Sequence, residues 1–559
     1  WQLDRLCRHG HRDAHRYLDL LPQQLKPQPL MKANPLMDLS ASPRSQPTQA
    51  KKTIPSWVFV LTAALVTSLA LVLRCRALGV DGLWQDEVFG ASFANLNPLE
   101  IVIAVLRFDI HPPLYYLQLK LWGLPSLADE WLLANSVAWS MGALLAATYG
   151  AYRFAGPATA LCVAALLAVS GSEIHYATEL RMYAMISCLT VIGWVRAEQW
   201  VNNPVPRNAA WLVAVLGILA GTHSSAFVPV SSVLLYTLLG RWSRSGFQGL
   251  LRSWGVVLSV GILLAPWLVN ASMRSVSHTG TPTFGAIVKT LSGWMLGYGA
   301  LEIPSTIRLV TTLIIAAFVI VALILGNRIT RHTLLSFVVW PVLILAIVSL
   351  AVRPVWIDRA VAFCAPFLAL SIVFFFYSLY SRNQDTSPMI LISLIGIFCI
   401  TSGIVAWGQA GLPRKMQYRE AARFIAQSNN ERLPIYVPVN VAFWGMARYL
   451  QSPSWGSVLE IQDPVRADGS ETWTRIYARL GTTWLTRLGL VPKTRELVTP
   501  NGTMWIGFSP LPSTVTSPGF WEVGNNDLLK DGAGCASATR EETQRFRGVV
   551  VLRCSVAAK

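Results

Sequence analysis

Long apolar runs constrain this chain more than any other feature of its sequence. Residues 57–73, 309–325 and 334–352 contain no charged side chain. A helix needs roughly 20 residues, at about 1.5 Å each, to cross the hydrocarbon core of a bilayer. Only 13% of all residues are charged, about half the share of a typical soluble domain. The sequence therefore predicts an α-helical polytopic membrane protein and excludes a plain cytosolic enzyme.

Hydropathy predicts about eleven transmembrane helices within a domain that covers residues 56–407. The predicted spans are 57–75, 131–152, 157–171, 182–200, 209–222, 226–240, 254–270, 307–327, 333–352, 360–380 and 389–407. Residues 1–55 are polar, and we expect a disordered cytoplasmic tail. With that tail inside, the arginine-bearing loops also fall on the cytoplasmic side, as the positive-inside rule requires.

The acidic residues have the opposite bias in this topology. Of the thirteen Asp and Glu between residues 57 and 407, all except Glu198 and Asp385 fall on the extracytoplasmic side. The positive-inside rule concerns Lys and Arg and does not sort acids in this way. We therefore expect chemistry at the outer face, where a long first loop covers residues 76–130.

Residues 408–559 have a different character. Segments 419–427, 441–450 and 473–488 read as helices, and 433–439, 503–508 and 549–553 as strands. This pattern predicts a small extracytoplasmic (periplasmic) α/β or α+β domain. Its two cysteines, Cys535 and Cys554, are candidates for a disulfide, because such bonds form outside the cytoplasm. The alternative is a pair of buried thiols.

The first outer loop carries a pair of adjacent acids and a histidine. Asp86 and Glu87 lie in the motif LWQDE, and His111 begins the motif HPPLYY. Neighbouring carboxylates near a membrane surface repel one another, and burial raises their pKa. Such a pair can act as a general base or bind a divalent cation. The alternatives are a solvated acidic turn that caps a helix and a stiff Pro-Pro turn that begins an interfacial helix.

Further polar residues come from later outer loops. Residues 172–183 include Glu179, Arg181 and Tyr183, and His223 and Arg359 follow in two other loops. Arg suits a phosphate because its planar guanidinium stays charged and offers several donors. Each residue also has a simpler interpretation, as a polar cap or an interfacial anchor. Together, these residues could bind a lipid phosphate and deprotonate an acceptor.

Several common signatures are absent from the sequence. It has no phosphate-binding loop of the form GxxxxGK[ST], no GxGxxG after a strand, no Asp-x-Asp and no CxxC. These absences disfavour an ATP-driven pump, a dinucleotide-binding enzyme and a paired-Asp nucleotide-sugar site. We expect no nucleotide cofactor. A divalent cation held by Asp86 and Glu87 stays open.

These motifs together resemble the GT-C superfamily of polytopic glycosyltransferases over residues 55–425. The matching residues are Trp84, Asp86, Glu87, His111, Tyr115, Tyr116, Tyr176, Glu179, Arg181 and Tyr183, with weaker support from His223 and Arg359. The chain looks most like the bacterial members related to protein O-mannosyltransferases (glycosyltransferase family 39-like), lipid A aminoarabinose transferases and rhizobial lipopolysaccharide galacturonosyltransferases.

The resemblance implies inverting transfer of a sugar from a polyprenyl-phosphate donor at the extracytoplasmic face of the bacterial inner membrane. Asp86 would be the catalytic base, and Glu87 would orient the acceptor or share a cation. Arg181 and Arg359 would hold the donor phosphate, and Glu179 would orient Arg181 or contact the sugar.

The remaining candidates for donor binding are His111, Tyr183 and His223. The chain also departs from many relatives: it has Ala360 where they often have Tyr after the late Arg, and Thr178 and Leu180 where they read Gln and Ala. The acceptor could be a glycolipid, a cell-envelope glycan or a protein.

Two other functions are compatible with such a chain. A lipid-linked sugar or polysaccharide transporter or flippase would place functional charges within its spans and at both faces. A non-catalytic GT-C-like protein would keep the fold and bind the lipid-linked sugar without turnover.

Overall fold

The computed structural model describes residues 55–94, 96–273, 279–298, 303–382, 388–429, 433, 435–437, 445–446, 448–450, 496–499, 502–506, 519–524, 535 and 539–555. Residues 1–54 of the predicted N-terminal tail and the predicted helix 473–488 lie outside these residues. Half of the predicted helix 441–450 does so too.

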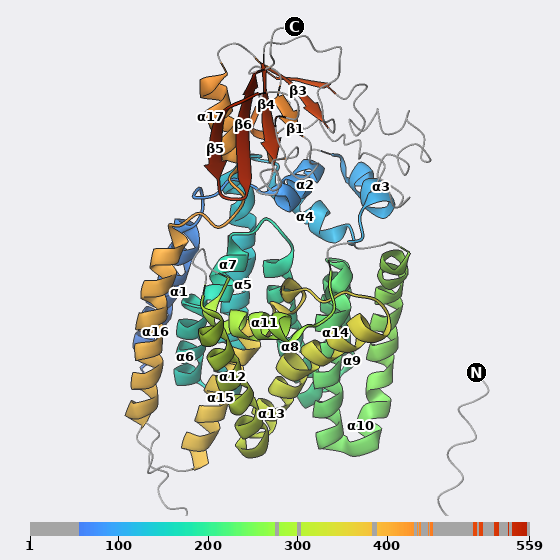
Figure 1. The fold of residues 1–559 in the computed structure, drawn as a ribbon. Helices are drawn as coiled ribbons and strands as arrows, with labels where there is room; N and C mark the ends of the chain where they lie inside the picture. Colours follow the sequence, from blue (N-terminus) through green and yellow to red (C-terminus); the bar gives the residue numbers. More distant parts are fainter. Residues whose placement is uncertain are drawn as a thin grey trace, which may run out of the picture. The chain divides into compact units, whose positions relative to one another are not determined.

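Helices make up most of the described chain (Figure 1). The α-helices before residue 221 are α1 (Ser56–Arg76), α2 (Gln85–Phe93), α3 (Pro98–Phe108), α4 (Leu114–Trp122), α5 (Asp129–Ala155), α6 (Pro157–Ala168), α7 (Gly171–Ala177), α8 (Tyr183–Asn202) and α9 (Pro206–Ala220). The later α-helices are α10 (Phe227–Ser272), α11 (Phe284–Leu296), α12 (Ser305–Leu325), α13 (Arg328–Leu334), α14 (Trp340–Ala351), α15 (Cys364–Arg382), α16 (Pro388–Ala410) and α17 (Tyr418–Ser428). Short 3-10 or π segments are η3 (Ser224–Ala226), η4 (Leu335–Val339) and η5 (Asp358–Val361).

The number of membrane spans differs from the predicted count. Six helices in the described residues are long and apolar enough to cross a bilayer, or seven if the bent pair α6 and α7 is one span. Four predicted segments fall on α6, α8, α9 and α16, which do not pass this criterion singly, and two fall on the single element α10. The count of eleven is therefore not confirmed, although each predicted segment overlaps a helix.

Helix α10 changes direction within its length. Gly246 has φ 52° and ψ −141°, which is not helical. A residue with a Cβ rarely adopts a positive φ, whereas glycine does so at little cost. Figure 1 shows the chain reversing there, so α10 consists of two helical arms.

A buried arginine lies where the bent pair α6 and α7 breaks. The two helices differ in direction by 61°. Arg74 of α1 is fully buried and donates to the carbonyl oxygens of Leu167 and Ala168, at 3.1 and 3.2 Å. These carbonyls lie at the end of α6, where the regular hydrogen-bond ladder of the helix stops. The guanidinium therefore satisfies the broken helix end from a neighbouring span.

The C-terminal part contains a six-stranded mixed sheet. Its strands are β1 (Ile435–Val437), β2 (Glu496–Thr499), β3 (Gly502–Ile506), β4 (Gly519–Gly524), β5 (Thr539–Phe546) and β6 (Val549–Ser555), in the order β2-β3-β1-β4-β6-β5. Strand β1 runs parallel to β3 and β4, and the other pairs are antiparallel. Helix α17 buries Tyr418, Ala421, Ala422 and Ile425. This spacing gives the helix one apolar face.

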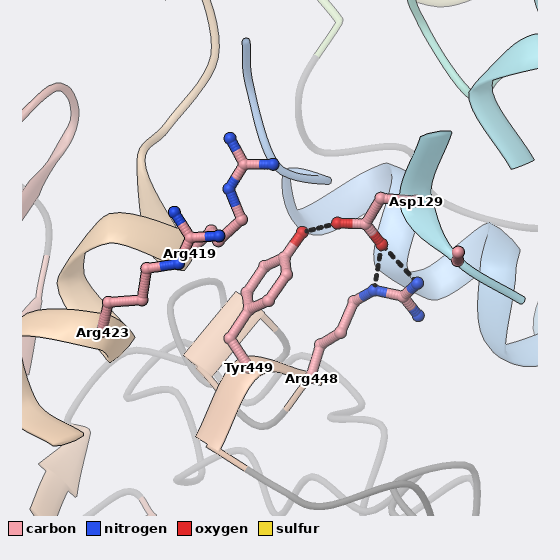
Figure 2. Close-up of a pocket in the computed structure, with 6 residues that line it drawn as sticks. Asp129, Arg419, Arg423, Arg448 and Tyr449 are labelled. Atoms are coloured by element: carbon pink, nitrogen blue, oxygen red, sulfur yellow. Dashed lines mark hydrogen bonds and ion pairs between the residues drawn. The ribbon is translucent and has the colours of Figure 1, made fainter. Parts of the chain in front are cut away.

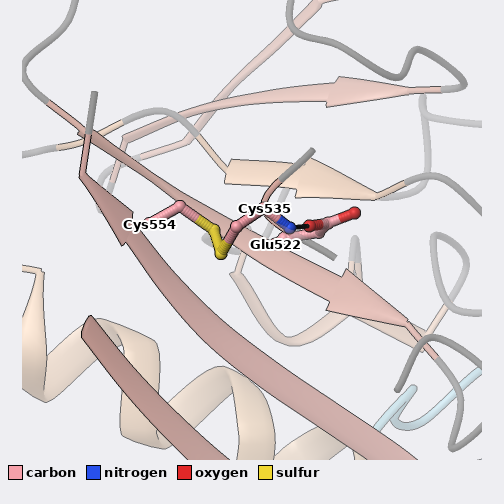
Figure 3. Close-up of side chains that lie close together, drawn as sticks. All are labelled: Glu522, Cys535 and Cys554. Carbon is pink, nitrogen blue, oxygen red and sulfur yellow. Dashed lines mark hydrogen bonds between the residues drawn. A yellow bond between two sulfur atoms is a disulfide. The ribbon is translucent and has the colours of Figure 1, made fainter. Parts of the chain in front are cut away.

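A disulfide joins the last strand to the segment before β5. Cys535 and Cys554 are bonded in the structure, with Cα atoms 5.4 Å apart (Figure 3). The carboxylate of Glu522 accepts a hydrogen bond from the backbone N–H of Cys535. Because both sulfurs are used in the bond, this cluster has no thiolate to offer a metal ion.

Candidate functional site

Asp86 and Glu87 occupy the first turn of α2, where the helix dipole favours carboxylates. Successive residues of an α-helix point about 100° apart, so the two side chains leave the helix in different directions. The side chain of Asp86 is 28% exposed, whereas that of Glu87 is 0% exposed. The two neighbours therefore lie in different environments.

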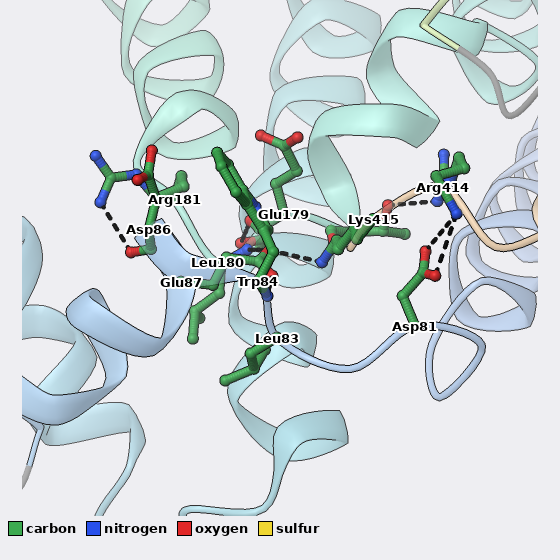
Figure 4. A network of polar contacts seen from close by, with 12 residues as sticks. Asp81, Leu83, Trp84, Asp86, Glu87, Glu179, Leu180, Arg181, Arg414 and Lys415 are labelled. Carbon is green, nitrogen blue, oxygen red and sulfur yellow. Dashed lines mark hydrogen bonds and ion pairs between the residues drawn. The ribbon is translucent and has the colours of Figure 1, made fainter. Parts of the chain in front are cut away.

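Glu87 is engaged on both of its oxygens. Its Oε1 lies 2.6 Å from Lys415 Nζ and accepts from the Leu180 N–H at 2.7 Å. Its Oε2 accepts from the Trp84 N–H at 3.0 Å (Figure 4). Burial raises the pKa of Glu87 to about 7, although Lys415 opposes the shift. This carboxyl therefore ties α2 to the loop after α7 and to the chain after α16.

Asp86 lies beside two arginines from different parts of the chain. Its Oδ2 is 3.6 Å from Arg359 Nη1. Its backbone carbonyl accepts from Arg181 Nη1 at 3.1 Å, and Figure 4 shows Asp86 and Arg181 next to one another. The Arg359 guanidinium lies over the Tyr183 ring, 5.9 Å from its centroid. A partly exposed carboxylate is thus held next to two permanent positive charges.

Two stacked histidines lie next to Arg181. The His111 and His223 rings are 4.1 Å apart, and Arg181 Nη2 is 3.4 Å from His111 Nε2. Burial holds the pKa of both imidazoles well below the usual value, and the Arg181 and Arg359 charges lower it further. Both rings are therefore neutral at physiological pH.

The His111 turn is fixed by a buried acid. Asp109 accepts from the His111 N–H at 3.2 Å and from the Tyr116 hydroxyl at 2.5 Å. Burial raises the pKa of Asp109, and the Tyr116 hydrogen bond and Arg181 oppose it. Pro112 and Pro113 restrict the backbone between the two hydrogen bonds. The predicted stiff turn thus presents His111 towards Arg181.

Glu179 contrasts with Glu87. Its carboxylate lies 3.2 Å from His175 Nε2. Burial by itself raises the pKa of Glu179, but His175, Lys415 and Arg359 outweigh it and lower the value to about 2. One site therefore holds a carboxyl that titrates near neutrality and another that stays ionised, a pattern typical of functional sites.

A pocket of about 230 Å³ opens beside these groups. It is lined by Trp84, His175, Thr178, Glu179, Tyr298, Arg414, Lys415 and Met416. Two of these residues have a buried nitrogen without a hydrogen-bond partner in the described part of the chain, Trp84 Nε1 and His175 Nδ1. Buried polar atoms are rarely left unpaired, so the pocket offers hydrogen-bonding capacity to a ligand.

The structure brings the predicted site residues together from four regions of the chain. The contacts above join Asp86, Glu87, His111, Arg181, Tyr183, His223 and Arg359, and Glu179 adjoins them through Lys415 and Arg359. Sequence reasoning did not single out Lys415, Arg414, Tyr298 or His175. The only signal for the first two was their position as the first charged residues after the last apolar span.

A divalent cation shared by Asp86 and Glu87 does not fit this arrangement. Both oxygens of Glu87 are held by Lys415 and two backbone N–H groups. Asp86 points away from Glu87 towards the Arg359 guanidinium. A cation between them would need to displace Lys415 and approach Arg359, at a large electrostatic cost. We assign no step to a metal.

No protein-family model and no curated protein sequence matches this chain. Among solved structures, it is similar to ArnT from Cupriavidus metallidurans bound to undecaprenyl phosphate, with TM-score 0.52 and 13% identity over 90% of this chain and 98% of that one. The apo state of the same protein gives TM-score 0.50 and 13% identity, over 89% and 98%. The chain therefore shares its fold with ArnT. This is the fold that the resemblance to the GT-C superfamily implied.

Proposed function

We propose that this protein is a glycosyltransferase that moves a sugar from a polyprenyl-phosphate donor to an extracytoplasmic acceptor. The observation that carries the proposal is the partly exposed carboxylate of Asp86, which lies beside the Arg359 guanidinium, while Arg181 donates to the Asp86 backbone carbonyl. The fold supports it, since a solved structure with that fold contains undecaprenyl phosphate. We expect the protein to act in the inner membrane, with this site at the outer face.

Asp86 is the base in this proposal. An acceptor hydroxyl oxygen attacks the anomeric carbon of the donor sugar while the bond from that carbon to the phosphate oxygen breaks. The phosphate leaves with the bonding electron pair, and the hydroxyl proton passes to Asp86 Oδ. A single displacement of this kind inverts the anomeric configuration.

Arg181 and Arg359 bind the donor phosphate. Both are permanently charged, and their guanidinium groups lie next to Asp86, that of Arg181 at its backbone carbonyl and that of Arg359 at its carboxylate. Fixed charges aimed at a leaving group stabilise the negative charge that develops on it. Because a polyprenyl phosphate leaves as a stable anion, the reaction needs no strong general acid. The neutral His111 ring orients Arg181 from the opposite side.

The donor sugar occupies the pocket beside Glu179. Trp84 and Tyr298 supply aromatic surface, and the ionised Glu179 accepts hydrogen bonds from sugar hydroxyls. Glu87 has a different role from the one expected of it, because its oxygens already have partners. It positions the motif around Asp86 and makes no contact with the acceptor.

The test is sugar transfer in membranes that contain the full chain. A panel of polyprenyl-phosphate sugars is supplied, and glycoconjugates are extracted and analysed by mass spectrometry. We expect a product with wild type and a loss of at least about 100-fold with Asp86→Asn, since a general base contributes about 10²–10⁴-fold. Glu100→Gln is the matched control, because it changes an acid in the same loop whose helix-capping role Gln also fulfils.

Equal product from Asp86→Asn and wild type, at equal protein level, would contradict the assignment of the base. Donor binding by wild type without turnover of any donor would favour the non-catalytic function. Movement of an intact lipid-linked sugar across the membrane would favour the transporter.

A further inference from the structure

The segment that leads into the candidate site is held along its length by residues that follow the last apolar helix. This entry segment comprises residues 79–87, between α1 and the first turn of α2. The strap is defined here as residues 411–417, which connect α16 to α17. Contacts from the strap, from α17 and from residues 448–449 reach the entry segment or the residues beside it.

The strap itself contributes two neighbouring cationic residues. The Arg414 backbone N–H donates to both carboxylate oxygens of Asp81, at 3.1 and 3.0 Å, and its guanidinium donates to Thr178 Oγ1 at 2.6 Å. Lys415 Nζ donates to Glu87 Oε1 at 2.6 Å and to the Thr178 carbonyl at 2.7 Å (Figure 4). The strap therefore contacts both loops that carry the proposed catalytic groups.

Helix α17 and the residues near 449 hold the other end of the entry segment. Arg419 donates to the Gly79 and Val80 carbonyls at 2.8 and 2.9 Å. The Tyr449 hydroxyl accepts from the Leu83 N–H at 2.6 Å. A Cβ at Gly82 would lie 2.6 Å from that hydroxyl, so only glycine allows this approach.

The same residues are anchored to the first turn of α5. Figure 2 shows Arg448 and Tyr449 converging on the carboxylate of Asp129, beside a pocket of about 310 Å³. Arg448 Nε donates to Asp129 Oδ1 at 2.8 Å. The part of the chain after α16 is therefore fixed to the helical bundle at two places around the entry segment.

We propose that Lys415 is a positioning residue for sugar transfer, through which the C-terminal domain holds Asp86 in its working orientation. This inference rests on the proposed function. Lys415 acts through Glu87, the immediate neighbour of Asp86, whose carboxyl also holds the Leu180 N–H next to Arg181. One ammonium group thereby sets the position of the base and of the phosphate-binding arginine together.

Removal of this ammonium leaves a buried carboxyl without its cation, which is strongly unfavourable. The entry segment then shifts or loosens. Displacement of reacting groups by about 1 Å can reduce the rate of an enzyme about 100-fold. Arg181 shifts together with this segment, and Lys415 itself lines the pocket. The donor still keeps Arg359 and Tyr298, which belong to other loops, so we expect kcat to fall by a larger factor than donor KM rises.

The experiment compares Lys415→Met, Lys415→Arg and Lys120→Met in the full chain, in membranes. Lys120 is the matched control, because its ammonium donates to a backbone carbonyl, that of Ala94. We expect Lys415→Met to lower kcat about 10-fold or more with less than about a threefold change in donor KM. Lys415→Arg restores most of the rate, and Lys120→Met stays near wild type.

The double variant Glu87→Gln/Lys415→Met separates positioning from general destabilisation, since both charges are absent from it. In the Glu87→Gln background, we expect Lys415→Met to lower kcat by less than about threefold, because the effects of two coupled residues are not additive. The double variant, compared with Glu87→Gln alone, also serves as the test if Lys415→Met fails to fold. An equal loss of kcat from Lys415→Met in wild type and in Glu87→Gln would overturn the inference. A wild-type kcat in Lys415→Met would overturn it too.

Hydrogen exchange followed by mass spectrometry gives a readout that does not need turnover. Lys415→Met should raise amide exchange in residues 79–94 and 178–182 but not in α12. Raised exchange in a protein that transfers no sugar would retain the positioning role and reject the proposed function. Unchanged exchange in these segments would reject the positioning role even if sugar is transferred.

Discussion

Two adjacent carboxyls in this protein have different chemistry because the helix points them in different directions. Asp86 is partly exposed beside Arg359, whereas Glu87 is fully buried against Lys415. From the sequence, the two residues were equal candidates for a base or a cation site. The difference depends on Lys415, more than 300 positions away in the chain, which local sequence patterns do not connect to Glu87.

Glu179 gives the site a pH-dependent contribution to stability. Its pKa is about 2 in the folded protein, against an ordinary value of 4.5. A lowered pKa stabilises the folded state above pH 4.5, and this contribution is lost as pH falls from about 4.5 towards 2. The difference between these two pKa values corresponds to about 3 kcal/mol of folding free energy.

We therefore expect the melting temperature of wild type to fall more steeply between pH 5 and pH 3 than that of Glu179→Gln. The measurement is thermal unfolding of the purified protein in lipid nanodiscs across this range. Parallel curves for the two proteins would show that Glu179 is not stabilised as an anion. Groups common to both proteins cancel in the comparison.

At the scale of single elements, hydropathy placed the helices better than it counted the spans. The predicted segments overlap the observed helices. Hydropathy did not show, however, that α6 and α7 form a bent pair or that α10 has two arms. These features depend on contacts between elements, such as Arg74 at the break after α6. The sequence patterns located β1, β3 and β6 but missed β2, β4 and β5. They also did not give the order of the sheet, which depends on long-range pairing.

The role of Arg74 makes a prediction about the helical bundle. Arg74→Met leaves the Leu167 and Ala168 carbonyls without this donor and removes a positive charge that interacts with the buried Glu173. We expect a loss of about 3 kcal/mol in stability, in the range found when one partner of a buried charged network is removed. The measurement is the midpoint of thermal or denaturant unfolding in detergent.

Arg76→Met is the matched control for this change. Arg76 is exposed, and its guanidinium lies over the Trp407 ring at 3.9 Å. We expect a loss within about 1 kcal/mol, as for most surface contacts. Equal losses for the two variants would mean that satisfaction of the broken helix end by Arg74 adds little stability.

At the scale of the whole molecule, the candidate site is assembled from the first loop, the segment after α7, the turn before η3, the start of η5 and the strap. The motifs around Asp86, His111 and Arg181 made the first part of this assembly predictable from the sequence. The strap was not predictable, because Arg414 and Lys415 stand in no motif and read as ordinary charges after a span. The structure adds the C-terminal domain as a part of the site.

The stereochemistry of transfer shows whether Asp86 acts as the base in a single displacement. A donor of known anomeric configuration is supplied, and the configuration of the new glycosidic bond is determined by NMR. A base at Asp86 and direct attack by the acceptor predict the opposite configuration in the product. Retention of the donor configuration would require a second displacement through a covalent intermediate, and it would contradict the role assigned to Asp86.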